Sequence, residues 1–119
     1  MQVDISVRKV GRIIILDLTG KITIGDGSQL LREEINRLLE AGEREMILNL
    51  EQATYIDSSG IGDLISRHTT ISNLGGHLKL LKVPRKIRDL LAVTKLLGVF
   101  ETFESEQDAI LSFGILGSV

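Results

Sequence analysis

Residues 57–62, with the sequence DSSGIG, combine an acid, two hydroxyl side chains and two glycines between an apolar segment and a helical pattern. Glycine lowers helix propensity, and Ser and Asp compete with the helix backbone for hydrogen bonds, so these residues favour a helix start. Asp57 or Ser58 is therefore predicted to be the N-cap, with its side-chain oxygen accepting from a free backbone N–H. The stretch is either a plain cap and turn or a site whose exposed hydroxyl is used.

Ser58 would lie at the positive end of the helix dipole, where negative charge is stabilised. A phosphate on Ser58 would add roughly 1.5 to 2 negative charges, and the N–H groups of Ser59 and Gly60 could donate hydrogen bonds to its oxygens. Gly60 and Gly62 would leave the backbone open to a partner's active site, whereas Asp57 would repel the phosphate. The added charge is therefore better suited to detection by a partner than to neutralisation within the chain.

A serine hydrolase is the enzyme alternative, because DSSGIG follows a strand and begins a helix. The Gly-x-Ser-x-Gly pattern of a nucleophile elbow is not matched around either serine. His68 lies further along the same helix, about 15 Å from Ser58 along the helix axis, which is too far for a base. His68 is expected to pack on the apolar face of the helix, and the chain is not expected to be an enzyme.

A second polar stretch, GDGS at residues 25–28, lacks the remainder of any P-loop or dinucleotide-binding pattern. It is interpreted as the start of a helix, and Gly25 and Asp26 are kept as candidate contact residues. The histidines, His68 and His77, belong to no grouping with metal-ligand spacing. The sequence therefore predicts no cofactor and no metal.

The composition describes one soluble globular domain covering residues 1–119, with 43% hydrophobic and 25% charged residues. A net charge of −2 and the scarcity of aromatics argue against nucleic-acid binding. The absence of cysteine excludes disulfides and thiolate chemistry. Because the chain opens without a signal-like segment and has no long apolar run, a cytoplasmic protein without membrane contact is expected.

The first third of the chain reads as strands followed by a helix. Alternating residues from Val3 to Val7 and an apolar run from Ile13 to Leu18 flank a turn, which predicts a hairpin. A short third strand is expected at residues 22–24. From about Ser28 the apolar positions recur at helical spacing, and Gly42 ends this helix.

Strands and helices then alternate. The apolar EMILNL at residues 45–50 is typical of a strand buried in the middle of a sheet. The DSSG helix, the strand HLKLLKV, a helix with Pro84 in its first turn, the strand VFETF and the helix SEQDAILSF follow. The predicted order is β-β-β-α-β-α-β-α-β-α, a small mixed α/β domain with a mostly parallel sheet and about four helices.

The C-terminal residues AILSFGILGSV are more apolar than an exposed end requires. Ile110, Leu111 and Phe113 are expected to dock on the sheet. The last apolar residues, Ile115, Leu116 and Val119, are either frayed or form a dimer contact. The sequence therefore leaves open a monomer or a weak homodimer.

The segment YIDSSGIG, preceded by MILNLEQA, resembles the signature of the STAS family, specifically of bacterial anti-sigma-factor antagonists. The likeness extends over nearly the whole chain, through LDLTGKI, GDGSQLL, LGGHLKLLKV and VTKLLGVFETFESEQDAI. It implies a STAS-like fold and a partner-switching role. An unphosphorylated antagonist binds a serine-kinase anti-sigma factor, the kinase phosphorylates the serine that corresponds to Ser58, and a phosphatase reverses the mark.

The resemblance also implies which residues contact the partner. These are Asp57, Ser59, Gly60, Ile61 and Gly62 around the serine, and Thr23, Gly25 and Asp26 in the segment GKITIGDG. Sporulation-type relatives tend to carry an acid in that segment, where position 23 of this chain is Thr23 and Asp26 is the nearest acid. The alternative is a STAS scaffold or signalling subunit, stressosome-like or associated with lipid transport, that binds partners without switching a sigma factor.

Overall fold

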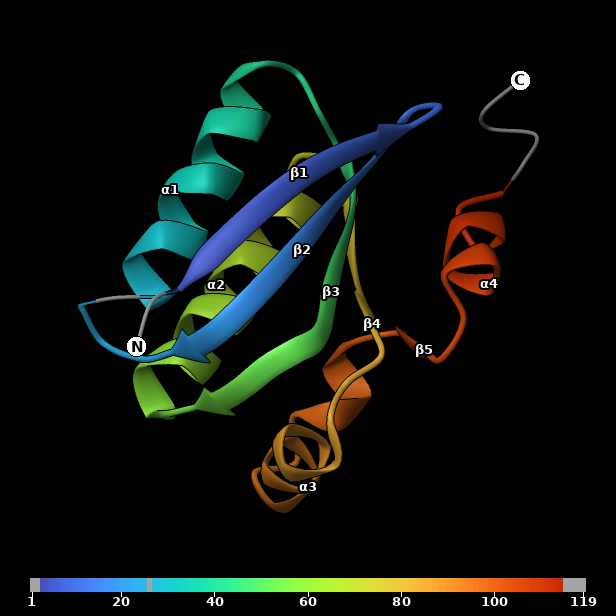
Figure 1. Cartoon of the computed structure of the whole chain (residues 1–119). Coiled ribbons are helices and arrows are strands. Elements are labelled where there is room, and N and C mark those ends of the chain that lie inside the picture. Colours follow the sequence, from blue (N-terminus) through green and yellow to red (C-terminus); the bar gives the residue numbers. More distant parts are fainter. Residues whose placement is uncertain (1–2, 26, 115–119) are drawn as a thin grey trace.

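The computed structural model describes residues 3–25 and 27–114. Within these residues, one five-stranded sheet has the strand order β1-β2-β3-β4-β5 (Figure 1). The strands are β1 Asp4–Val10, β2 Ile13–Ile22, β3 Glu45–Ile56, β4 His77–Leu81 and β5 Thr102–Phe103. β1 pairs antiparallel with β2, and the remaining neighbours pair in parallel. This is the mixed, mostly parallel sheet that the sequence predicts.

Helices cover the two faces of the sheet unequally. The larger layer consists of α1 Gly27–Glu40, α2 Ser58–Asn73 and α3 Arg85–Val93, whose apolar residues share one core with the sheet. A short 3-10 turn, η1 Leu97–Val99, follows α3. The C-terminal helix α4 Glu106–Leu111 packs on the opposite face. Parallel strands require crossovers, and α1 and α2 provide those that flank β3.

Strand residues alternate between the two cores, as a pleated sheet requires. In β2, Ile14, Leu16 and Leu18 face the larger helical layer. Ile13 and Ile15 face α4 together with Ile47, Leu81 and Ala109. The central strands are therefore buried on both sides, which explains the nearly continuous apolar runs in the sequence.

Two cations attach the α4 region to the sheet. Arg8 of β1 donates to Asp17 at 2.5 Å and to Glu106 at 2.8 Å, and these hydrogen bonds lower the pKa of both carboxyl groups. Lys79 of β4 is only 5% exposed, donates to the carbonyl oxygen of Ser112 at 3.1 Å, and lies 4.4 Å from the centroid of the Phe113 ring. A buried ammonium requires such partners.

The order of elements predicted from the sequence is confirmed, with one difference near the hairpin. Residues 22–24 do not form a separate strand, because β2 continues to Ile22, which pairs with Ile56. Gly25 then adopts a positive φ of 84°, and Thr23 and Ile24 belong to the turn region rather than to the sheet. The third expected strand is thus the end of the second.

Two other segments also differ from the prediction. The strand expected for VFETF is limited to β5, because residues 97–99 form η1 and Phe100 turns into the core. Pro84 is the N-cap of α3 rather than a residue of its first turn, and its fixed φ of −60° suits either position.

The C-terminal docking is confirmed in part. Ile110 and Phe113 pack against the core beneath α4, whereas Leu111 is exposed. Ile115, Leu116 and Val119 lie outside the described residues. Within the described ranges, no helix has both the length and the apolar character needed to cross a bilayer.

Candidate functional site

The two polar stretches meet at one edge of the sheet. Strands β2 and β3 are parallel and end opposite each other, with Ile22 paired to Ile56. The chain leaves both strands here and begins α1 and α2, as Figure 1 shows. Functional loops of α/β sheets gather at the carboxyl ends of the strands. The end of β2 and the DSSG segment therefore lie at the same edge of the sheet.

Of the two residues predicted as the N-cap of α2, Asp57 and Ser58, the structure has Asp57 in this position. Its backbone is extended, with φ −105° and ψ −175°, and its Oδ1 accepts from the Gly60 N–H at 2.9 Å. This hydrogen bond, followed by weaker ones from neighbouring amides, lowers the pKa of Asp57. Asp57 is therefore a carboxylate at neutral pH and already interacts with one of the free amides at the helix start.

The second carboxylate oxygen of Asp57 reaches across to the other loop. Oδ2 accepts from the Ile24 N–H at 3.2 Å, and the Asp57 N–H donates to the Ile22 carbonyl oxygen at 3.2 Å. Asp57 thus connects the start of α2 to the end of β2 and to the residues that follow it. The connection is made by the backbone of the β2–α1 loop and does not depend on a particular side chain there.

Ser58 is the first residue of α2 and is exposed to solvent. Ser59 is half-buried, and Gly62, one turn along the helix, is exposed. Ile61 is only 8% exposed and packs in the larger core, so little of its side chain is available to a partner. The accessible part of the DSSGIG segment therefore consists of Ser58, parts of Asp57 and Ser59, and the backbone at Gly62.

The two glycines of DSSGIG differ in what they contact. A Cβ at Gly60 would lie 2.3 Å from the Ile22 carbonyl oxygen and 2.7 Å from the Ile56 side chain. Gly60 is therefore needed for α2 to approach the sheet. A Cβ at Gly62 would have nothing within 4 Å, so the fold does not require this glycine. In a helix interior Gly costs about 1 kcal/mol relative to Ala.

The residues expected in the β2–α1 loop lie at the same edge. Thr23 is half-buried, and its carbonyl oxygen accepts from the Ser28 N–H at 3.1 Å. Gly25 is exposed. Asp26 lies outside the described residues. Thr23 and Gly25 therefore lie at the edge of the sheet where α2 begins, and their contact with a partner stays a prediction.

A polar cluster beneath this surface was not predicted from the sequence. Ser28 of α1 is 1% exposed, and its hydroxyl donates to the carboxylate of Asp63 in α2. Arg32 of α1 donates to the same carboxylate at 3.3 Å. The cluster connects the N-terminal halves of two neighbouring helices. It joins residues 35 positions apart, for which the sequence contains no local signal.

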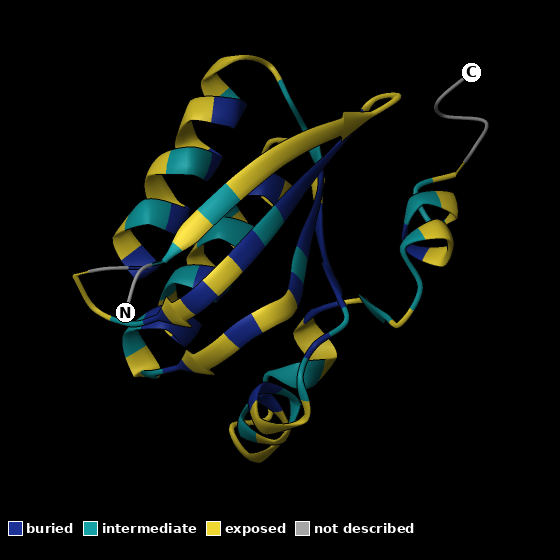
Figure 2. Cartoon of the chain, in the orientation of Figure 1, coloured by how far each residue is buried: buried dark blue, intermediate teal, exposed yellow. Residues whose placement is uncertain are grey.

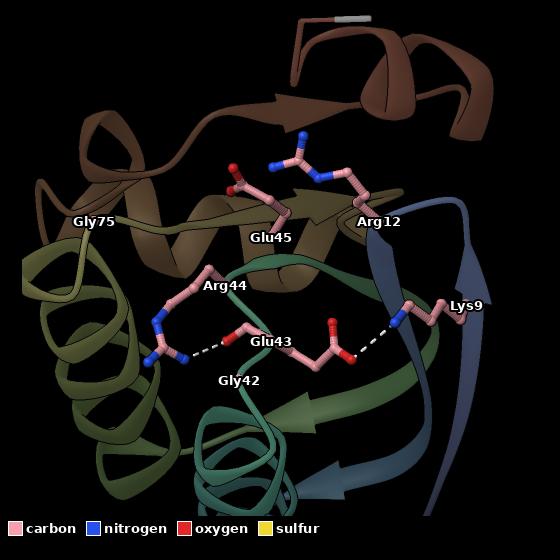
Figure 3. A pocket seen from close by; sticks show the side chains of 7 residues that line it. All are labelled: Lys9, Arg12, Gly42, Glu43, Arg44, Glu45 and Gly75. Carbon is pink, nitrogen blue, oxygen red and sulfur yellow. Dashed lines mark hydrogen bonds and ion pairs between the residues drawn. The ribbon is translucent and has the colours of Figure 1, made fainter. Parts of the chain in front are cut away.

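A shallow hollow of about 370 Å³ lies at the opposite end of the sheet, near the β1–β2 turn (Figure 3). Two of its polar groups already pair with each other, since Lys9 contacts Glu43 at 3.0 Å. Arg44 donates to the Glu43 carbonyl oxygen at 2.7 Å. Among the described residues, no three His, Asp or Glu side chains gather so that they could hold a metal ion.

His68 has the packing role that its position predicts. It is half-buried on α2, with its ring centroid 5.0 Å from that of Phe100 in an edge-to-face arrangement. His77 begins β4, and its Nδ1 lies 2.7 Å from Glu45. Neither ring is part of the Ser58 surface.

The fold and the site define a small α/β domain with an exposed serine at a capped helix start. The STAS domain model matches residues 4–109, and the chain belongs to the STAS domain family. An anti-sigma F factor antagonist of Paenibacillus polymyxa is 21% identical over 117 residues, which are 98% of this chain and 99% of that protein. That relative is by name a regulatory protein rather than an enzyme.

Solved structures show the same fold. An anti-sigma factor antagonist from Mycobacterium paratuberculosis has a TM-score of 0.83 at 14% identity, covering 93% of each chain. The Bacillus cell fate determinant SpoIIAA, in its phosphorylated form, has a TM-score of 0.71 at 21% identity, covering 90% of this chain and 96% of that one. The predicted STAS resemblance is thereby confirmed.

Proposed function

We propose that this protein is an anti-sigma-factor antagonist controlled by phosphorylation of Ser58. With Ser58 unmodified it binds a serine-kinase anti-sigma factor and so releases a sigma factor. The kinase phosphorylates Ser58 and the complex dissociates, and a phosphatase restores the binding form. The observation that carries the proposal is the exposed Ser58 hydroxyl at the start of α2, directly after a cap supplied by Asp57.

The charges around Ser58 favour a switch that is detected by a partner. The neighbouring Asp57 is a carboxylate whose two oxygens already accept from Gly60 and Ile24. A phosphate on Ser58 would face this negative charge, and it would also compete for the amides at the helix start. A dianion that becomes buried against a partner without a matched cation is costly. A loss of 3–4 kcal/mol, on the order of a few hundred-fold in affinity, is enough to separate the complex.

Gly62 supports close approach by a partner. The fold gains nothing from a glycine there, because a Cβ would have nothing within 4 Å. A helical glycine without a structural reason leaves the backbone on the Ser58 side of α2 uncovered. A kinase that must bring its active site to Ser58 would benefit from that space. Thr23, Gly25 and Asp26 would form the second part of this chain's contact surface for the kinase.

The test is a map of phosphorylation sites on the protein from its own cells, followed by capture of partners with two variants. We expect phosphate on Ser58, a kinase retained by Ser58→Ala, and the same kinase lost by Ser58→Asp. Aspartate is favourable in the first turn of a helix, so Ser58→Asp should stay folded. Thermal unfolding of both variants checks this.

Ser59→Ala and Ser59→Asp are matched controls. They remove the same hydroxyl or introduce the same charge one residue further into the helix, at a half-buried side chain. We expect the kinase still to phosphorylate Ser59→Ala and Ser59→Asp, because both keep the Ser58 hydroxyl. If Ser58 carries no phosphate in cells and both Ser58 variants retain the same partners, the switch is wrong. The STAS scaffold or signalling subunit would then be the better explanation.

A further inference from the structure

Ile24 is an apolar side chain in the β2–α1 loop, and it is 75% exposed. Residues 24 and 25 form a turn, and Gly25 has a φ of 84°. Figure 2 shows this connection as exposed, at the same edge of the sheet as the start of α2. Since neither core includes the Ile24 side chain, stability of the domain does not account for an isoleucine here.

The backbone of Ile24 is hydrogen-bonded to the side chain of the residue that precedes Ser58. Its N–H donates to Asp57 Oδ2 at 3.2 Å, and Asp57 is the residue immediately before Ser58. Gly27 restrains the other end of the loop, because a Cβ there would lie 2.0 Å from the Lys21 carbonyl oxygen. The backbone is therefore held in place at Ile24 and at Gly27, which reduces the conformational entropy that it loses on binding.

Exposure alone does not mark a binding residue, because single exposed apolar side chains are common. Val93, the last residue of α3, is 79% exposed but belongs to neither of the two segments that meet at the Asp57 cap. What distinguishes Ile24 is its hydrogen bond to the cap of the helix that carries Ser58. Tyr55, close to the end of β3 and also exposed, adds a second large side chain at the same edge.

We infer that Ile24 is an apolar anchor of the surface through which the protein binds the kinase that phosphorylates Ser58, and that it fits an apolar recess beside the kinase active site. The inference rests on the proposed function and adds a specificity-determining contact to it. Apolar anchors in a desolvated interface carry a large share of binding energy, while a polar side chain at the same place leaves the recess unfilled. Ile24 would thus select the partner, and Ser58 would control its release.

The experiment uses the kinase recovered with the Ser58→Ala chain and identified by its ATP-dependent phosphorylation of Ser58 in the parent chain. Its affinity is measured for Ser58→Ala, alone and combined with Ile24→Ser or Val93→Ser. We expect Ile24→Ser to weaken binding about tenfold or more and Val93→Ser to change it less than about twofold. Both side chains are exposed, so thermal unfolding should be unchanged in each variant.

Phosphorylation kinetics provide an independent readout. With Ser58 present, Ile24→Ser should raise the KM of the kinase for the protein and leave kcat nearly unchanged, since the serine itself is not displaced. A kinase that binds and phosphorylates Ile24→Ser as well as the parent overturns the inference and leaves the switch intact. Failure to recover any kinase that phosphorylates Ser58 overturns the proposed function, and this anchor with it.

Discussion

The starts of α1 and α2 are built from similar residues but offer different chemistry. Each follows a strand at the same edge of the sheet, and each contains a glycine that lies against the end of β2. A Cβ on Gly27 would lie 2.0 Å from the Lys21 carbonyl oxygen, and one on Gly60 would lie 2.3 Å from that of Ile22. Yet Ser28 is buried while Ser58 is exposed.

The position of the serine relative to the glycine explains the difference. Glycine marks the point at which each helix approaches the sheet most closely. Ser28 comes directly after Gly27, so its hydroxyl points between the two helices and donates to Asp63. Ser58 comes two residues before Gly60, ahead of the close contact, and its side chain faces solvent. One serine therefore joins the two helices, and the other is open to solvent.

The largest expected effect comes from filling the close contact at α1. Gly27→Ala should destabilise the protein by about 3 kcal/mol or more, because its Cβ would overlap a backbone carbonyl that cannot move aside easily. Gly62→Ala is the matched control, since its Cβ has open space and alanine favours a helix. It should stabilise by up to about 1 kcal/mol. Urea unfolding of both variants measures the difference, and equal stability would contradict this account of Gly27.

We expect substitutions of the two serines to differ in their effect on stability, by less than the two glycine substitutions do. Ser28→Ala removes the donor to a largely buried carboxylate and should cost about 1–2 kcal/mol, with Arg32 retaining part of the interaction. Ser58→Ala removes an exposed hydroxyl and should change stability by less than about 0.5 kcal/mol. The measurement is again urea unfolding. A Ser58→Ala chain that loses as much stability as Ser28→Ala would show that Ser58 has a structural role.

Local patterns made part of the site predictable. The change from apolar strand to DSSG indicated the helix start and limited its cap to two residues, because N-capping depends only on neighbours in the chain. The alternation of strands and helices likewise predicted the layers of the fold. What both features share is a physical cause that acts within a few residues.

The sequence could not show contacts between distant segments. The Ser28–Asp63 pair spans 35 residues, and the hydrogen bond from Ile24 to Asp57 spans 33. Nothing in the residues next to Lys79 in the chain indicates that it is buried. Its burial depends on Ser112 and Phe113, which follow α4 and pack against it. The short β5 depends on Phe100 turning into the core. Each of these follows from tertiary packing, which overrides local preference.

The smallest expected effect concerns the charge that joins the two helix starts. Hydrogen bonds, chiefly from the Gly60 amide, lower the pKa of Asp57 in the folded state. A carboxyl group with a lowered folded pKa contributes stability above its unfolded pKa of about 3.9, and loses this contribution as pH falls through the folded pKa. Asp57→Asn keeps a capping side chain but cannot ionise. We expect the parent to be the more stable chain from pH 5 to 8, with an advantage that shrinks below about pH 4.

Urea unfolding of both chains at each pH gives this difference, and the other acids, such as Asp17 and Glu106, titrate in both and cancel from it. Asp89→Asn controls for the loss of one surface carboxylate, because Asp89 lies on α3, 4.0 Å from Arg85. A parent advantage that stays constant down to pH 2 would mean that the Asp57 charge does not support the cap. The link between the Ser58 helix and the Ile24 loop would then depend on hydrogen-bond geometry alone.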